Sequence, residues 1–202
     1  RRAPRGVGQG PAGGREELGL GFECVSQGEL ARVLAFFPQL EPQRLLFTPN
    51  FAPKEEYAFA LAKKCFVTLD SIYPLQQWPE LFRGQEVFLR LDPGQGRGHH
   101  HHVKTAGERS KFGIGPRELP EVLRLVSQHE VTVVGLHAHA GSGIHELQHW
   151  ADIAKFLLKM RTSFPQVRYL DLGGGLGIPG SSQEAPLDLG RIDASLRGVK
   201  NA

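Results

Sequence analysis

The sequence predicts an α/β protein in which helices cover a parallel sheet. Six apolar runs of strand length alternate with segments of helical period along the 202 residues. These runs are continuous in Val, Leu, Ile and Phe, as is typical of strands buried on both faces. The first three begin about 21 residues apart, the spacing of minimal βα units. Six such units form either a complete open sheet or part of an eight-stranded β/α barrel, which usually needs ~250 residues.

The strand–helix units follow one another in a regular order. The expected strands are 21–25, 44–48, 65–70, 86–92, 131–139 and 167–172. The expected helices are one with an apolar stripe from Leu30 to Phe37, one opened by Pro53, one over 73–82, one from Pro116, one around Trp150 and one over 188–199. Residues 1–15 carry Gly, Pro and Arg without hydrophobic periodicity, so we expect a disordered lead-in there and a single domain over 16–202.

Composition excludes several classes of protein. With 40% hydrophobic and 22% charged residues, the chain is neither disordered, fibrous nor membrane-spanning. Four arginines within residues 1–15 account for more than the net charge of +3, which removes the support for a nucleic-acid partner. Cys24 and Cys65 lack CxxC spacing and are expected to be buried and reduced. We therefore expect a cytoplasmic protein with neither a membrane nor a nucleic-acid partner.

Polar residues gather where each expected strand ends. They include Glu23 after the first strand, Arg90 in the fourth, His137 and His139 in the fifth, and Asp171 in the sixth. The carboxyl ends of parallel strands open on the same rim, so these side chains are expected to converge on one active-site face. Simple capping of buried strands is the alternative.

Gly173, Gly174 and Gly175 directly follow the sixth strand. A backbone without Cβ atoms can approach an anion closely and point several N–H groups at it, which favours a phosphate site. The spacing is not the G-x-G-x-x-G of a dinucleotide fold. A tight strand-to-helix turn is the alternative.

The segment HAHAGSG places His137 and His139 on the same side of a strand, because side chains alternate with period two. Either the two histidines bind a metal with a third ligand, or one is a core residue and the other stacks on a flat ring. We favour the second interpretation and expect no metal. Ser142 adds a hydroxyl beside the glycines, and the run His99–His102 is expected to lie in a solvated or interfacial loop.

Four motifs resemble those of diaminopimelate decarboxylases, most closely the decarboxylase half of the bifunctional aspartate kinase–diaminopimelate decarboxylases. They are GFECVSQGEL, GHHHHVKTAGERSKFGI, GLHAHAGSGI and LDLGGGLGIP, in this order and spacing. The resemblance implies an alanine-racemase-type (β/α)8 barrel, of which about six βα units are present. It also implies pyridoxal 5'-phosphate as the cofactor and conversion of meso-2,6-diaminopimelate, an amino-acid substrate, to L-lysine and carbon dioxide in lysine biosynthesis. The full-length members of the family are homodimers.

The resemblance also implies roles for particular residues. His139 matches the catalytic imidazole that stacks on the cofactor ring, while Ser142 and Gly173, Gly174 and Gly175 match the groups that hold its phosphate. Glu23, Arg90 and Lys111 match polar positions that line the barrel mouth. Gln27 and Gly143 depart from the residues that the family often has, although neither position carries chemistry.

Other features of the family have no counterpart in the sequence. Residues 1–15 contain no lysine to bind the cofactor covalently, and there is no E-P-G-R segment. The resemblance therefore implies that this chain alone is an inactive fragment of the enzyme. We also expect it to be poorly soluble, because a barrel without its first and last strands has unpaired apolar edges. A non-catalytic homologue that binds the cofactor or a partner, and a relative that acts on ornithine or arginine, remain alternatives.

Overall fold

A computed structural model describes residues 19–94, 111–139, 141–181, 183 and 185–200. The chain divides into two compact units, Arg1–Val67 and Thr68–Ala202, which are treated separately below. The expected lead-in over 1–15 and the run His99–His102 lie outside the described residues. Within the described ranges, no helix has the length and apolar character to cross a membrane.

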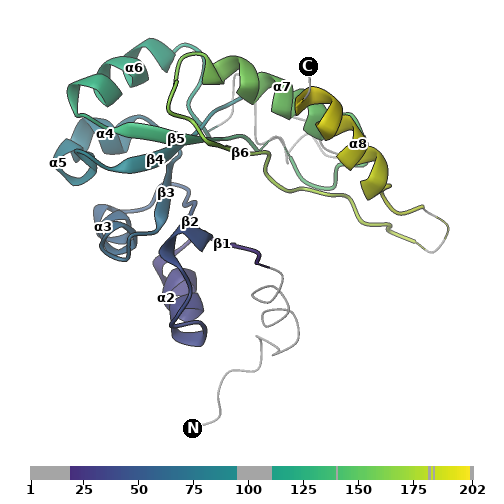
Figure 1. Ribbon diagram of the computed structural model, residues 1–202, viewed down its shortest axis with the longest axis horizontal. Coiled ribbons are helices and arrows are strands. Elements are labelled where there is room, and N and C mark those ends of the chain that lie inside the picture. Colours follow the sequence, from purple (N-terminus) through teal and green to yellow (C-terminus); the bar gives the residue numbers. More distant parts are fainter. Residues whose placement is uncertain (1–18, 95–110, 140, 182, 184, 201–202) are drawn as a thin grey trace, which may run out of the picture. The chain divides into compact units, whose positions relative to one another are not determined.

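The first unit consists of parallel strands with helices between them (Figure 1). Its elements are β1 (Phe22–Cys24), α2 (Gln27–Phe36), the 3-10 helix η1 (Pro42–Arg44), β2 (Leu45–Phe47), α3 (Lys54–Ala62) and the first half of β3 (Phe66–Leu69). Strand β2 pairs in parallel with β1 and with residues Phe66 and Val67 of β3. Helix α2 begins at Gln27, because the Ser26 hydroxyl accepts a 3.2 Å hydrogen bond from the Glu29 N–H and so caps the helix.

The second unit continues the same alternation (Figure 1). It contains the second half of β3, α4 (Tyr73–Gln77), α5 (Pro79–Phe82), β4 (Glu86–Arg90), α6 (Leu119–Gln128), β5 (Thr132–His137), α7 (His149–Arg161), β6 (Tyr169–Asp171) and α8 (Leu189–Lys200). Neighbouring strands pair in parallel in chain order. This pattern confirms the predicted parallel sheet, and the strands are shorter than expected at their ends.

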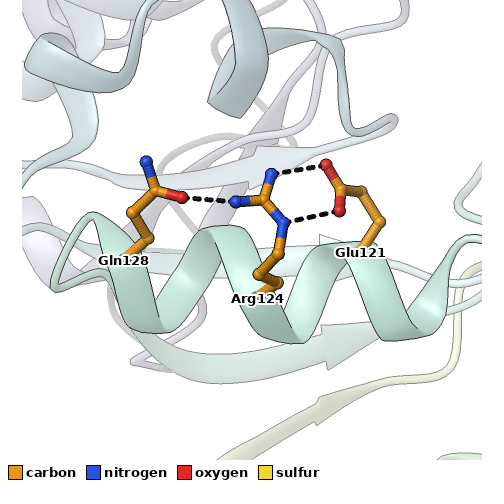
Figure 2. Close-up of polar contacts among 3 residues, drawn as sticks. All are labelled: Glu121, Arg124 and Gln128. Carbon is orange, nitrogen blue, oxygen red and sulfur yellow. Dashed lines mark hydrogen bonds and ion pairs between the residues drawn. The ribbon is translucent and has the colours of Figure 1, made fainter.

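Helix α6 shows how the helices of this unit divide between core and solvent. Val122 and Leu125 are buried on one face. On the other, Arg124 donates two hydrogen bonds to the Glu121 carboxylate and one to Gln128 (Figure 2). This pairing lowers the pKa of Glu121, but exposed pairs of this kind contribute little to stability. The polar stripe is thus a solvated helix surface.

The helix expected over 73–82 is broken into α4 and α5. Trp78 lies between them with φ −134° and ψ 46°, outside the helical region. Pro79 has no N–H to donate, and its ring disfavours a helical conformation in the residue before it. Proline therefore ends α4 and starts α5, a restriction that the apolar periodicity of the segment conceals.

Both cysteines are free and buried, as expected, and Cys24 and Cys65 are only 1% and 4% exposed. Burial raises the pKa of each thiol from 9.0 to about 11. Because only the thiolate reacts, we expect alkylation by iodoacetamide at pH 8 to be about a hundredfold slower in the folded chain than in urea. Alkylation at equal rates in both states would contradict this prediction.

Candidate functional site

Strands β4, β5 and β6 end at the same level in the second unit. Arg90 pairs with His137 across the first two strands, and His137 pairs with Asp171 across the next two. The loops that follow these strands carry most of the candidate residues. The predicted convergence of polar side chains on one rim is therefore observed for these three strands.

His137 is a structural histidine, one of the two roles considered for the histidine pair. It is 3% exposed, and its Nδ1 lies 2.6 Å from Oδ2 of Asp171. The other carboxylate oxygen, Oδ1, accepts a 2.9 Å hydrogen bond from the Gly173 N–H. Burial favours the neutral acid, but the bonds from His137 and Gly173 outweigh it and lower the pKa of Asp171. Asp171 is thus an ionised acceptor at neutral pH.

His139 lies just beyond the end of β5 and is half-buried. Its Nδ1 accepts a long hydrogen bond, 3.4 Å, from the Gly174 N–H. Burial, reinforced by the positive charge of Arg90, lowers the pKa of His139 from 6.5 to about 4. At neutral pH the ring is therefore an uncharged imidazole whose proton is on Nε2.

The glycine turn, residues 173–175, has a shape that side chains would block. Gly173 and Gly175 adopt φ values of 66° and 80°. A Cβ on Gly173 would lie 2.9 Å from Nδ1 of His139, and one on Gly175 would lie 2.2 Å from the Gly141 carbonyl oxygen. A Cβ on Gly174 would meet nothing within 4 Å. The turn is thus packed on both sides and open at its centre.

The loop that carries Ser142 is fastened to this turn. Ile144 donates its N–H to the Gly175 carbonyl at 2.8 Å, and the Ile144 carbonyl accepts the N–H of Gly177 at 2.8 Å. Ser142 itself is exposed. Its Cα would lie 3.3 Å from a Cβ on Gly175, which places the serine directly beside the turn.

Arg90 and Lys111 share one aromatic partner. The Arg90 guanidinium is 5.1 Å from the centroid of the Phe112 ring, and Nζ of Lys111 is 5.2 Å from it. Arg90 is 6% exposed, whereas Lys111 is exposed. The adjoining backbone is held by a 2.8 Å bond from the Ile114 N–H to the Arg90 carbonyl. Phe112 thus links the two cations at the end of β4.

The second unit therefore brings together most of the residues singled out in the sequence. They are Arg90, Lys111, His139, Ser142, Gly173, Gly174 and Gly175. Glu23 lies in β1 of the first unit, where it is exposed.

Sequence reasoning missed Phe112 and the specific role of Asp171. An Asp two residues before a glycine, as in Asp171 and Gly173, is a sequence signal for an Asx turn and could have revealed the role of Asp171. Gly173 does have the positive φ that such a turn favours.

This arrangement suits a flat, anionic ligand. An uncharged imidazole offers an aromatic face, and the glycine turn leaves room at its centre for an anion beside the backbone. Arg90 adds a buried positive charge nearby. Among the described residues there is no group of three or more His, Cys, Asp or Glu side chains placed to hold a metal ion.

Comparisons with known proteins agree with this geometry. A family model described as "Pyridoxal-dependent decarboxylase, pyridoxal binding domain" matches residues 15–201. Diaminopimelate decarboxylase of Methanothermobacter thermautotrophicus is 35% identical over 91% of this chain and 44% of its own length. The enzyme of Escherichia coli K12 is 31% identical over 85% of the chain and 41% of its own length.

A solved structure agrees as well. A crystal structure of diaminopimelate decarboxylase superposes with a TM-score of 0.82 at 29% identity, covering 93% of this chain and 45% of that one. The chain thus spans less than half the length of these relatives. The match confirms the prediction that its six parallel strand–helix units form part of a (β/α)8 barrel.

Proposed function

Because this chain belongs to the pyridoxal-dependent decarboxylases, whose pyridoxal-binding domain it matches, we propose that its second unit binds pyridoxal 5'-phosphate. This membership agrees with the resemblance carried by the four motifs. The proposal rests above all on one observation, the contact between Nδ1 of His139 and the N–H of Gly174. It joins a neutral imidazole to the open centre of a glycine turn.

Each candidate residue has a definite task in binding. The glycine turn and the Ser142 hydroxyl would hold the phosphate, since such donors favour an anion. The Gly173 N–H is bonded to Asp171, so the turn would offer the Gly175 N–H and that of Gly174, whose long 3.4 Å bond to His139 would be exchanged for one to a phosphate oxygen. His139 would lie against the pyridine ring and orient it. Because the pKa of His139 is lowered to about 4, its ring stays uncharged and its Nε2 keeps the proton at neutral pH. When bound, pyridoxal phosphate supplies the electron sink that decarboxylation requires.

Charged residues complete the proposed site. Arg90 would keep positive charge beside the ligand while Phe112 fixes its guanidinium, and Lys111 would provide polar support at the rim. We propose that Glu23 also lines the mouth of the barrel, because it matches a polar position there in the family. These residues would bind and orient the ligand, and none of them has to attach to it covalently.

We further propose that the protein containing this chain decarboxylates meso-2,6-diaminopimelate to L-lysine. The relatives named above are diaminopimelate decarboxylases, which supports this substrate over ornithine or arginine. We propose that the enzyme is a homodimer in the cytoplasm, where free buried thiols such as Cys24 and Cys65 persist. Carbon dioxide release by the intact protein from each of the three amino acids tests the substrate, and activity on ornithine or arginine alone would contradict it.

Cofactor binding can be tested on the 202-residue chain itself. We expect saturable, one-to-one binding of pyridoxal phosphate, detected by a change in its absorption spectrum. Ser142→Ala should weaken binding about tenfold, the loss expected for one hydrogen bond to a charged group. His139→Ala should weaken it about fivefold through lost ring contact.

A matched control uses another serine of the same unit. Ser163 lies after α7 and lines a cavity of about 520 Å³ together with the start of β5. His139, in contrast, lies beyond the other end of that strand. Ser163→Ala should therefore bind the cofactor as the unmodified chain does. Absence of saturable binding, or equal losses in both serine variants, would overturn the proposed site.

A further inference from the structure

Asp171 lies at the end of β6, beside His137 at the end of β5 and just before the glycine turn. Its side chain is 22% exposed, and each of its oxygens has a close polar neighbour. Nδ1 of His137 lies 2.6 Å from Oδ2, and Oδ1 accepts the Gly173 N–H at 2.9 Å. Its backbone carbonyl accepts the Ala138 N–H at 3.0 Å. One residue of β6 thus ties the end of β5 to the start of the glycine turn.

The glycine turn in turn holds His139. The bond from Gly173 to Asp171 directs the chain into the left-handed conformation of Gly173, at φ 66°. In this conformation Gly173 lies against the His139 ring, because a Cβ there would be 2.9 Å from Nδ1. The next residue, Gly174, then donates its N–H to the same nitrogen. The placement of His139 therefore depends on a turn that the Asp171 carboxylate fixes.

We propose that Asp171, braced by His137, is a positioning residue that fixes the ring orientation and the tautomer of His139 through the glycine turn. It acts through backbone N–H groups rather than by contact with the ligand. The importance of this role for catalysis rests on the proposed function, whereas the role itself can be measured without any cofactor.

Asp171 could act on His139 through its charge or by holding the ring in place, and losing these two effects would change the pKa of His139 in opposite directions. The groups whose charges act on His139 are Arg90 from β4, His137 from β5, Asp171 from β6 and His149 from α7. The negative charge of Asp171 raises the pKa of His139, so removing the charge alone would lower that pKa below about 4. Releasing the ring into water would instead raise it toward 6.5, because burial is the largest cause of the shift.

The experiment is a titration of the 15N-histidine-labelled, cofactor-free chain followed by NMR. In the unmodified chain we expect the proton on Nδ1 of His137 and on Nε2 of His139. This readout needs no variant, so it applies even if a substitution prevents folding. A His137 without a proton on Nδ1, or a His139 with its proton there, would overturn the proposal.

Two substitutions separate position from charge. Asp171→Ala removes the acceptor for Gly173 and should raise the pKa of His139 by one unit or more. Asp171→Asn also removes the charge but keeps an oxygen that can accept the Gly173 N–H, so its His139 pKa should remain below that of the alanine variant. If both variants lower this pKa alike, Asp171 acts by charge alone and the proposal is wrong.

A control and a second readout complete the test. Asp193 on α8 is 59% exposed and pairs with Arg197 at 2.8 Å, so Asp193→Ala should leave the His139 titration unchanged. Asp171→Ala should also weaken binding of pyridoxal phosphate about tenfold, with rescue by Asp171→Asn. If the tautomers and pKa values follow expectation while no variant binds the cofactor, the proposed function fails and the positioning role stands.

Discussion

Gly175→Ala is expected to destabilise the second unit by about 2–6 kcal/mol and to abolish binding of pyridoxal phosphate. The substitution forces a side chain into the left-handed region at φ 80°, which costs about 1–3 kcal/mol. It also places a Cβ 2.2 Å from the Gly141 carbonyl oxygen, so that the loop carrying Ser142 must move away. Overpacking of this kind adds about 1–3 kcal/mol. Urea unfolding followed by circular dichroism gives the change in the free energy of unfolding.

The neighbouring glycine provides the control. A Cβ on Gly174 would meet nothing within 4 Å, and its φ lies outside the left-handed region. Gly174→Ala should therefore change the free energy of unfolding by less than about 1 kcal/mol. Its methyl group would enter the space proposed for the phosphate, so cofactor binding should still weaken. Equal destabilisation by the two alanine variants would show that the turn is not packed as described.

The architecture could be predicted because it follows from local patterns in the sequence. Continuous apolar runs such as 86–92 indicate a strand buried on both faces, and four consecutive residues of β4, 87–90, are indeed buried. Polar residues that follow such runs must share one rim when the strands are parallel. Arg90, His137 and Asp171 consequently fall in register, which required no knowledge of side-chain contacts.

The division of roles within the site could not be predicted in the same way. Alternation along a strand places His137 and His139 on one side, but it does not tell which one a carboxylate binds. That depends on Asp171 from β6, 34 positions after His137, and on the burial of the pair. The break at Trp78 was missed for a different reason, because apolar periodicity continues through a proline that ends one helix and begins another.

The stability of the second unit is expected to fall steeply in mild acid because of His139. The unfolded chain binds a proton at this residue with a pKa near 6.5, whereas the folded chain does so only near 4. Between these values the unfolded state binds more protons, so the free energy of unfolding decreases as the pH falls from 6.5 to 4. The difference of 2.5 units would correspond to about 3 kcal/mol for a fully buried ring, and because His139 is only half-buried we expect a loss of about 1–2 kcal/mol.

Asp171 adds a second loss at lower pH. Its pKa is lowered in the folded state from 3.8, so its contribution to stability is complete above that value and disappears as the pH falls further. Urea unfolding at intervals between pH 7.5 and 4.5 isolates the first effect. In His139→Gln the titrating ring is absent, so the free energy of unfolding should depend less on pH across this range. The same pH slope in both proteins would mean that the His139 ring is solvated in the folded chain, which contradicts its place against the glycine turn.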